Sequence, residues 1–276
     1  MHQQHTKHAW ALYKWSIVLA FAVVGPALGA DLPGEAPVLP VGSWTGGYGG
    51  ISLGLRQANN NWRTSDIFPN LVIVQPISTG SMNSAAARVA AFAGYNWQLS
   101  SGWIAGVETD VGWANNNKNA VPMPGTAGIN GAGCAGTCTG LPTSSVKETW
   151  DGSARGRLGT LITPNTLLFG TAGAALQSIE LAASCGPTGA GTQSCSMIHN
   201  ESYTKTKVGW TIGGGIEQDL ANNWVSRVDY RYSDFGTFRQ QLFNFFVPVP
   251  GGTDDRMTAN VKVRTHTLNF GFAHKF

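Results

Sequence analysis

The chain has 276 residues, of which only 12% are charged, and it contains 36 Gly and 10 Trp. Residues 1–29 hold two lysines and no acid, so the rest of the chain carries 16 basic against 15 acidic side chains. This balance argues against a nucleic-acid binder, which has a clustered basic face. Few charges with many Gly and aromatic residues are typical of barrel strands rather than of a soluble helical domain.

The N-terminal residues predict export. Lys7 and Lys14 precede an apolar run over residues 17–24, and small residues follow at positions 27 and 29. We therefore predict a secretory signal peptide over residues 1–29. A membrane anchor is the alternative, but the run is short for a helix that spans a bilayer.

Eight segments with period-2 alternation follow a Pro-rich entry segment, and period 2 is the pattern of a strand with two different faces. They span residues 44–55, 88–97, 103–113, 149–161, 167–176, 208–217, 224–232 and 267–276. In 167–176 the alternation is too weak to assign the faces. Short connections (98–102, 162–166 and 218–223) alternate with long ones (56–87, 114–148, 177–207 and 233–264).

The last strand has one apolar face and ends on an aromatic residue. The apolar positions are Leu268, Phe270, Phe272 and Phe276. A membrane-spanning strand of a barrel needs about ten residues with an apolar outward face. We predict that this strand closes a barrel and carries the signal for its insertion into the membrane.

Together these features predict an all-β fold, an eight-stranded antiparallel transmembrane β-barrel with four long extracellular loops and short periplasmic turns. The predicted domains are the signal peptide 1–29, the entry segment 30–42 and the barrel 43–276. A soluble sandwich or lipocalin-like barrel would also alternate. Aromatic residues at both ends of the outward stripes, such as Trp103 and Trp113, favour the membrane barrel.

The inward faces carry charges of both signs in equal number, which predicts a paired network in the lumen. Its members are Arg88, Glu108, Asp110, Asp151, Arg155, Arg157, Glu217, Arg227, Asp229 and Arg231. An eight-stranded barrel is only wide enough for its own side chains, which favours a structural plug over a narrow ion path. Arginines on the same face also argue against acid–base catalysis by Glu108 or Asp110.

Four cysteines are candidates for disulfides in an oxidising compartment. The local pairings are Cys134 with Cys138 and Cys185 with Cys195, but three connectivities remain open. A metal site that adds His199 fits no common zinc spacing. We predict no catalytic set, metal or cofactor.

Several short motifs in a fixed order resemble a known family. They are Ala30–Pro33, Trp44–Gly46 with Tyr48, Ala93–Trp97, Arg155–Gly159, Gly209–Thr211 with Gly215 and Glu217, Asp229–Tyr232 with Asp234–Gly236, and His266–Phe276. The chain resembles the small porin-family outer-membrane antigens of α-proteobacteria, the immunogenic and hemin-binding group, and more distantly opacity-protein and OmpA-type barrels. The resemblance implies the bacterial outer membrane and no shared catalytic residues.

We therefore expect a non-enzymatic envelope protein with a structural and surface-interaction role through its extracellular loops. The alternative is small-solute or hemin-type transport through a porin-like channel. The expected partners are outer-membrane lipid and lipopolysaccharide, the barrel-insertion machinery, and an extracellular ligand or host surface. No nucleic acid is expected among them.

Overall fold

The computed structural model describes residues 43–67, 79–99, 102–121, 123–124, 142–185, 198–243 and 257–276. The predicted signal peptide and entry segment lie outside these residues. The strands of the described part are β1 (Gly46–Ile67), β2 (Thr79–Ser81), β3 (Ser84–Gln98), β4 (Trp103–Ala120), β5 (Thr143–Thr163), β6 (Thr166–Cys185), β7 (His199–Asp219), β8 (Trp224–Leu242) and β9 (Met257–Lys275). No helix within the described part is long and apolar enough to cross a membrane.

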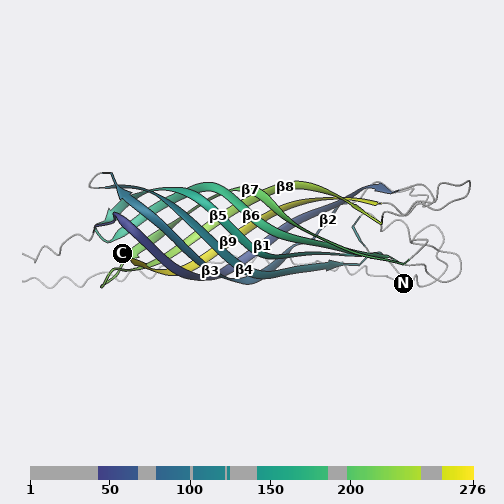
Figure 1. Cartoon of the computed structure of the whole chain (residues 1–276), viewed down its shortest axis with the longest axis horizontal. Helices are drawn as coiled ribbons and strands as arrows, with labels where there is room; N and C mark the ends of the chain where they lie inside the picture. Colours follow the sequence, from purple (N-terminus) through teal and green to yellow (C-terminus); the bar gives the residue numbers. More distant parts are fainter. Residues whose placement is uncertain are drawn as a thin grey trace, which may run out of the picture. The chain divides into compact units, whose positions relative to one another are not determined.

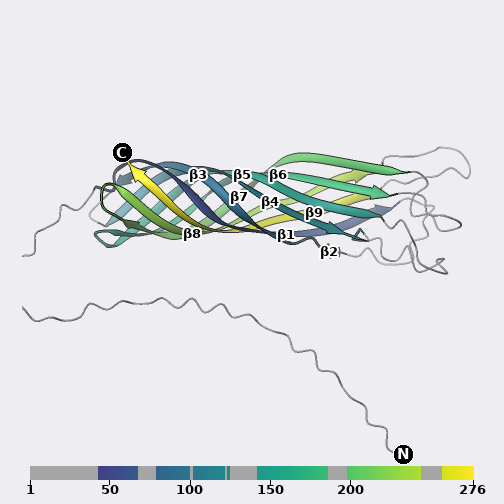
Figure 2. The same cartoon turned by 90° about the horizontal axis from the view of Figure 1, so that it is seen from below.

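The strands form one antiparallel sheet that closes on itself. The order is β1-β3-β4-β5-β6-β7-β8-β9, and β9 pairs back with β1 (Figures 1 and 2). The short β2 pairs with β1 at Asn61–Arg63, beyond the last partner of β3, so it continues the line of β3 rather than adding a strand to the ring. The predicted all-β antiparallel barrel is confirmed.

Short turns gather at one end of the barrel, which we call the turn end. They connect β3 to β4, β5 to β6 and β7 to β8, and the last residue of β9 also lies there. In the turn before β8, Asn222 and Asn223 both have positive φ, which asparagine tolerates better than most residues and which two-residue hairpin turns require. The opposite end is called the loop end.

The outward faces near the turn end are apolar, as predicted. Leu53 of β1 and Phe270 of β9 are neighbours in the register and are 67% and 56% exposed. Leu268, Phe272 and Phe276 are also exposed. In β6, whose faces the sequence left open, Leu167 and Phe169 are buried in the lumen and Leu168 points outward. A barrel with this exposed surface requires an apolar solvent.

The strand ends at the loop end were predicted wrongly. The described residues of the segments expected to be long loops are mostly strand, since β1 continues to Ile67, β4 to Ala120, β6 to Cys185 and β8 to Leu242. β5 and β7 likewise begin at Thr143 and His199. The extension was missed because the two faces of each strand exchange their polarity there.

This exchange is clearest in β9. Near the turn end, Phe270 points outward and Asn269 inward; closer to the loop end, Val261 points inward and Lys262 lies on the outer face. The period stays at 2 throughout, so no residue is skipped. The membrane part is thus apolar outside and polar inside, whereas the extension is polar outside and apolar inside, as in a water-soluble β-protein.

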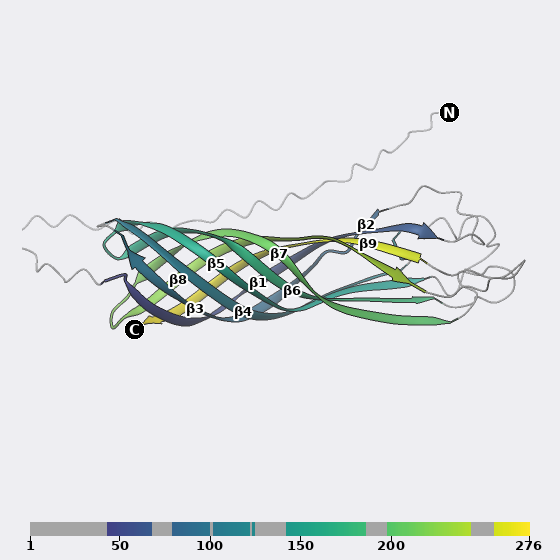
Figure 3. The same cartoon turned by 45° about the horizontal axis from the view of Figure 1, so that its top comes forward.

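The extension is a two-sheet sandwich. β7 and β8 stop pairing beyond Trp210 and Asp234, and β4 no longer pairs with β3 beyond Ala114. One sheet therefore contains β8, β9, β1 and β2, and the second contains β4, β5, β6 and β7. Figure 3 shows the blue and yellow ends of β1 and β9 lying apart from the green β7 at this end.

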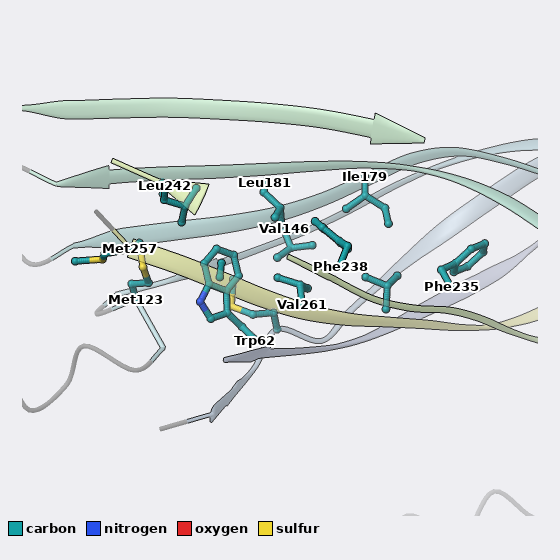
Figure 4. Close-up of a cluster of buried hydrophobic side chains, with 14 of the residues drawn as sticks. Trp62, Met123, Val146, Ile179, Leu181, Phe235, Phe238, Leu242, Met257 and Val261 are labelled. Atoms are coloured by element: carbon teal, nitrogen blue, oxygen red, sulfur yellow. The ribbon is translucent and has the colours of Figure 1, made fainter. Parts of the chain in front are cut away.

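A hydrophobic core fills the space between these two sheets. Trp62, Phe238 and Val261 enter it from the first sheet, and Val146 and Leu181 from the second (Figure 4). All five are nearly inaccessible to solvent. Burial of side chains from both inner faces is what stabilises a β-sandwich, so the extension has its own core.

Phe270→Arg tests the position of the membrane belt. A charge on the lipid face near the bilayer midplane is expected to lower the free energy of unfolding by about 2–4 kcal/mol. Asn59→Arg, on the outward face of β1 in the extension, is the control and is expected to change it by less than about 0.5 kcal/mol. Urea unfolding in lipid vesicles, followed by Trp fluorescence, measures both. If both variants lowered the free energy of unfolding equally, the lipid-facing belt would not be where we place it.

Candidate functional site: a charged network in the lumen

The inward face of the barrel carries six arginines and six carboxylates among the described residues. They are Arg56, Arg88, Arg155, Arg157, Arg227 and Arg231, and Glu108, Asp110, Glu148, Asp151, Glu217 and Asp229, none more than 8% exposed. The ten residues identified from the sequence all lie here. Arg56 and Glu148 were missed because they fell in segments that were expected to be loops.

Glu108 is the centre of the level nearer the turn end. Arg227 donates a hydrogen bond to it at 2.6 Å, Arg155 donates a second, and the Tyr48 hydroxyl donates a third at 2.8 Å. Arg157 lies 3.6 Å away. Three guanidinium groups surround one carboxylate, so this level has an excess of positive charge. Other acidic side chains must balance it.

Glu217 supplies part of that balance. It accepts a hydrogen bond from Arg157 at 2.8 Å. The Arg157 guanidinium also lies over the Phe169 ring at 4.3 Å, and Arg227 lies over the Phe92 ring at 4.5 Å. Aromatic faces attract cations, so these rings stabilise the arginines where no carboxylate faces them.

Asp110 and Asp151 form the next level. Arg88 and Arg231 lie 2.6 and 2.7 Å from Asp110, and Arg88 also donates to Asp151. Arg56 lies 2.6 Å from Asp151. Each carboxylate is thus shared between arginines, so removal of one group unbalances several contacts at once.

Asp229 connects the two levels. It lies 3.2 Å from the Arg227 guanidinium and accepts a hydrogen bond from Asn269 at 3.0 Å. Asn269 in turn accepts one from Arg88 at 3.3 Å. The network is therefore continuous from Glu108 to Asp151.

Arg56 is bound on every side. It donates to Asn116 at 2.8 Å and to the backbone carbonyls of Ala114, Glu148 and Thr149 at 2.9–3.2 Å, besides its contact with Asp151. A buried arginine requires hydrogen-bond acceptors for most of its N–H groups, and Arg56 has them. Continuing the alternation of β1 two residues past Gly54 would have identified it.

Glu148 differs from the other carboxylates. One of its oxygens accepts a hydrogen bond from Asn60 at 2.7 Å, but the other has no hydrogen-bond partner although the residue is fully buried. It lies where the charged network meets the core of the sandwich. Its charge is the least compensated of the six.

Close packing around the network depends on glycine at two places. A Cβ atom at Gly94 would clash with the Tyr48 ring, and one at Gly112 would clash with the Arg88 guanidinium. Large side chains from one strand therefore lie over bare backbone on the next. This accounts for some of the glycine on the inward face.

Apolar layers close the network at both ends. At the turn end, Trp44, Ile104, Leu167 and Phe169 form a buried cluster, and the Trp44 indole donates to the Pro164 carbonyl at 3.3 Å. At the loop end lies the sandwich core. The charged groups thus occupy a compartment with apolar walls above and below.

The other predicted site residues lie mostly outside the described part. Cys185 ends β6, is buried and takes part in a disulfide. Cys134, Cys138 and Cys195 lie outside the described residues, so the pairing stays a prediction. His199 begins β7 and contacts the Phe243 ring, and the described residues contain no group of acids, His and Cys arranged to hold a metal.

The sequence matches a known domain family. The family model of the outer membrane protein β-barrel domain matches residues 22–276. The chain belongs to this family. As an outer-membrane β-barrel, the protein lies in the bacterial outer membrane with its apolar belt in contact with lipid.

Individual relatives and a solved structure are also similar to this chain. The chain is 30% identical over 271 residues to the 31 kDa outer-membrane immunogenic protein of Brucella melitensis, covering 95% of this chain and 97% of that protein. It is 28% identical to the 22 kDa outer membrane protein of Rhizobium leguminosarum, covering 73% and 69%. The outer membrane protein OprG of Pseudomonas aeruginosa has the same fold, with a TM-score of 0.51 at 13% identity over 86% of this chain and 98% of that one.

Proposed function

We propose that this outer-membrane barrel is a non-enzymatic structural and surface-interaction protein with a closed lumen. The observation that carries the proposal is a balanced charge network that joins opposite walls between two apolar layers. In such a barrel the short turns face the periplasm and the loop end faces outward. The sandwich therefore stands outside the membrane, where it can meet other surfaces.

The cross-lumen contacts support a closed barrel. In the ring of eight strands, β4 and β8 lie opposite each other. Arg227 of β8 is 2.6 Å from Glu108 of β4, and Arg231 of β8 is 2.7 Å from Asp110 of β4. Side chains that touch across the full width argue against a continuous aqueous path at these two levels, in accord with the size of eight-stranded barrels.

The same contacts argue against catalysis. A general acid or base must exchange a proton with a substrate, and a nucleophile needs a free base beside it. Glu108 and Asp110 are instead each held by several arginines. We propose no cofactor for this chain.

Bilayer conductance tests the closed lumen. The refolded protein is expected to give no current steps above baseline in planar bilayers, while an open porin in the same bilayer serves as the positive control. Reproducible steps that change with Arg155→Gln or Asp229→Asn would overturn the proposal. They would instead favour the alternative, a narrow channel for small solutes or hemin-type uptake.

The sandwich is the part we propose to act at the cell surface. Its outward faces are polar and carry exposed cations such as Arg63 and Arg239. The relatives from Brucella are named immunogenic, and we propose by analogy that the sandwich and its loops form the antigenic surface of this protein. We also propose that the barrel-insertion machinery recognises Leu268, Phe270, Phe272 and Phe276 of the terminal strand.

A further inference from the structure

Glu148 and Asn60 meet where the charged network ends and the sandwich core begins. Asn60 comes from β1 in the first sheet and Glu148 from β5 in the second. The Asn60 amide Nδ2 donates a hydrogen bond at 2.7 Å to Oε1 of Glu148. The two side chains are 1% and 0% exposed. This hydrogen bond therefore joins the two sheets at the base of the sandwich, in a place without solvent.

Each of these two side chains also has an oxygen atom without a hydrogen-bond partner. The two atoms are Oε2 of Glu148 and Oδ1 of Asn60. A buried acceptor without a donor is unfavourable, and a charged one is more so. An ionised carboxylate and an amide oxygen are both acceptors, so neither can satisfy the other. A proton on Oε2 would turn one of the two acceptors into a donor.

The nearest arginine does not neutralise Glu148. Arg56 donates to the main-chain carbonyl of Glu148 at 2.9 Å, whereas its ion pair is with Asp151 at 2.6 Å. The register of β5 and β6 shifts between Glu148 and Asp151, which marks a bulge. The bulge separates Glu148 from the row of carboxylates that the arginines share, because it moves the residue along the strand.

The other side chains around the two residues leave Glu148 without a counter-charge. In the register, Glu148 faces β4 and β6 and Asn60 faces β9, and the inward side chains there are uncharged. They are Asn116, Ile179 and Val263. The apolar Met82, whose backbone N–H donates to the Asn60 carbonyl, is also buried. Arg231 of β8 is engaged by Asp110 and Asp151.

Glu148 lies beyond the lipid belt, in the extension. On the outer face beside it, Lys147 is the register partner of Glu180, and a lipid-facing surface would not carry two such charges. Arg56 and Asp151 act on the Glu148 carboxyl with opposite signs. Burial has the largest effect and raises the pKa of this carboxyl above its ordinary value of 4.5, because water no longer solvates the charged form.

We propose that Glu148 holds a proton and forms a pH-sensitive acid–amide pair with Asn60 that fastens the two sheets together. In this pair Oε1 accepts from the Asn60 amide, and the protonated Oε2 donates to Asn60 Oδ1. Both unpartnered oxygens are then satisfied. Release of the proton to solvent removes one of the two hydrogen bonds and leaves a charge in a dry site. The extension must then open to hydrate that charge.

The closed extension is the form that acid favours. In the open form the carboxyl is hydrated and titrates near the ordinary value of 4.5, whereas in the closed form its pKa is raised. Below pH 4.5 both forms are protonated, and the closed form keeps its full advantage. As the pH rises from there to the raised pKa, the open population grows about tenfold per pH unit. Above the raised pKa no further change is expected.

Infrared spectroscopy tests the proton directly. At neutral pH, in a detergent without ester groups, the refolded protein is expected to show the carbonyl stretch of a protonated carboxyl, although exposed carboxyls are ionised there. Glu148→Gln is expected to remove this band. Glu180→Gln makes the same change on the outer face at the same level and is expected to keep it. A spectrum without the band, or a band that Glu148→Gln keeps, would overturn the proposal in favour of a bound water or cation.

The rate of proteolysis in the extension tests the opening. Protein inserted in vesicles is treated with proteinase K, and each rate is divided by that of an unstructured peptide at the same pH. From about pH 5 to about pH 8 the wild-type rate is expected to rise about tenfold or more. Glu148→Gln is expected to change less than about twofold, because glutamine keeps both hydrogen bonds to Asn60 at every pH. Glu180→Gln is expected to follow the wild type.

Equal pH dependence in wild type and Glu148→Gln would overturn the proposal, since other titrating groups would then cause the opening. Heat-dependent mobility on gels confirms that each variant is folded. The acid–amide pair does not depend on a closed lumen. Current steps in planar bilayers would overturn the proposed function and leave the pair standing, so the two experiments fail separately.

Discussion

Glu108→Gln is expected to lower the free energy of unfolding by about 3–5 kcal/mol. The carboxylate is fully buried and accepts hydrogen bonds from Arg155, Arg227 and Tyr48. A neutral amide of nearly the same shape removes the nearest counter-charge of Arg155 and Arg227 in a low-dielectric lumen, and this is costly. Unfolding by guanidinium chloride in detergent micelles, followed by Trp fluorescence, gives the free energy.

Glu148→Gln is the matched control for this experiment. It makes the same change to another fully buried glutamate, but one that has an oxygen without a hydrogen-bond partner. The amide can still accept from Asn60, and no close ion pair is broken. We expect a change of less than about 1 kcal/mol, with a gain in stability allowed. If both variants lost the same stability, burial alone rather than charge pairing would explain the network.

Trp62→Ala is expected to destabilise the sandwich by about 3–5 kcal/mol. The Trp62 ring is fully buried in the core between the two sheets, and its indole donates to Thr64 at 3.1 Å. Its removal leaves a large cavity in a small core. Because the barrel below has separate contacts, we expect local opening of the extension while the membrane part remains folded.

Limited proteolysis of protein inserted in vesicles measures this opening. The variant is expected to be cleaved in the extension far faster than the wild type, in proportion to the population of the open form. Trp103→Ala, which removes a half-exposed Trp from the outward face of β4 near the turn end, is expected to leave that cleavage rate unchanged. Heat-dependent gel mobility should persist in both variants. If Trp62→Ala abolished that mobility, barrel and sandwich would unfold as one unit.

In the charge network, the alternation of the sequence predicts which way a side chain points but not which group it pairs with. Arg155 and Arg157 lie two residues apart in a strand whose other face is apolar, so their inward direction follows from the alternation. Their partners could not be assigned from the sequence. Arg155 reaches Glu108, which is its partner in the register with the adjacent β4, and Arg157 reaches Glu217 on β7, two strands away, so the first contact depends on the register and the second on the curvature of the sheet.

The strand ends at the loop end were not predicted, although the sequence contains an alternating pattern there. In residues 257–266 of the sequence, apolar residues such as Val261 and Val263 already alternate with polar ones. The parity of this alternation is the reverse of that in the terminal strand, where the apolar face meets lipid, so the two patterns do not indicate a single strand. An apolar inward face forms a strand only if another apolar face covers it, and here that cover comes from Val146 and Leu181 in distant parts of the chain.

The sequence by itself determined the class of fold, the direction of each charged side chain in the membrane part and the position of the lipid belt. Each of these depends on the period of 2 and on the transfer of apolar surface to lipid, and both are local properties. Only the tertiary structure decided where the strands end, which charges pair, and that Arg56 and Glu148 belong to the lumen. These depend on contacts between strands far apart in the chain, and their energies are set by neighbours that no local segment contains.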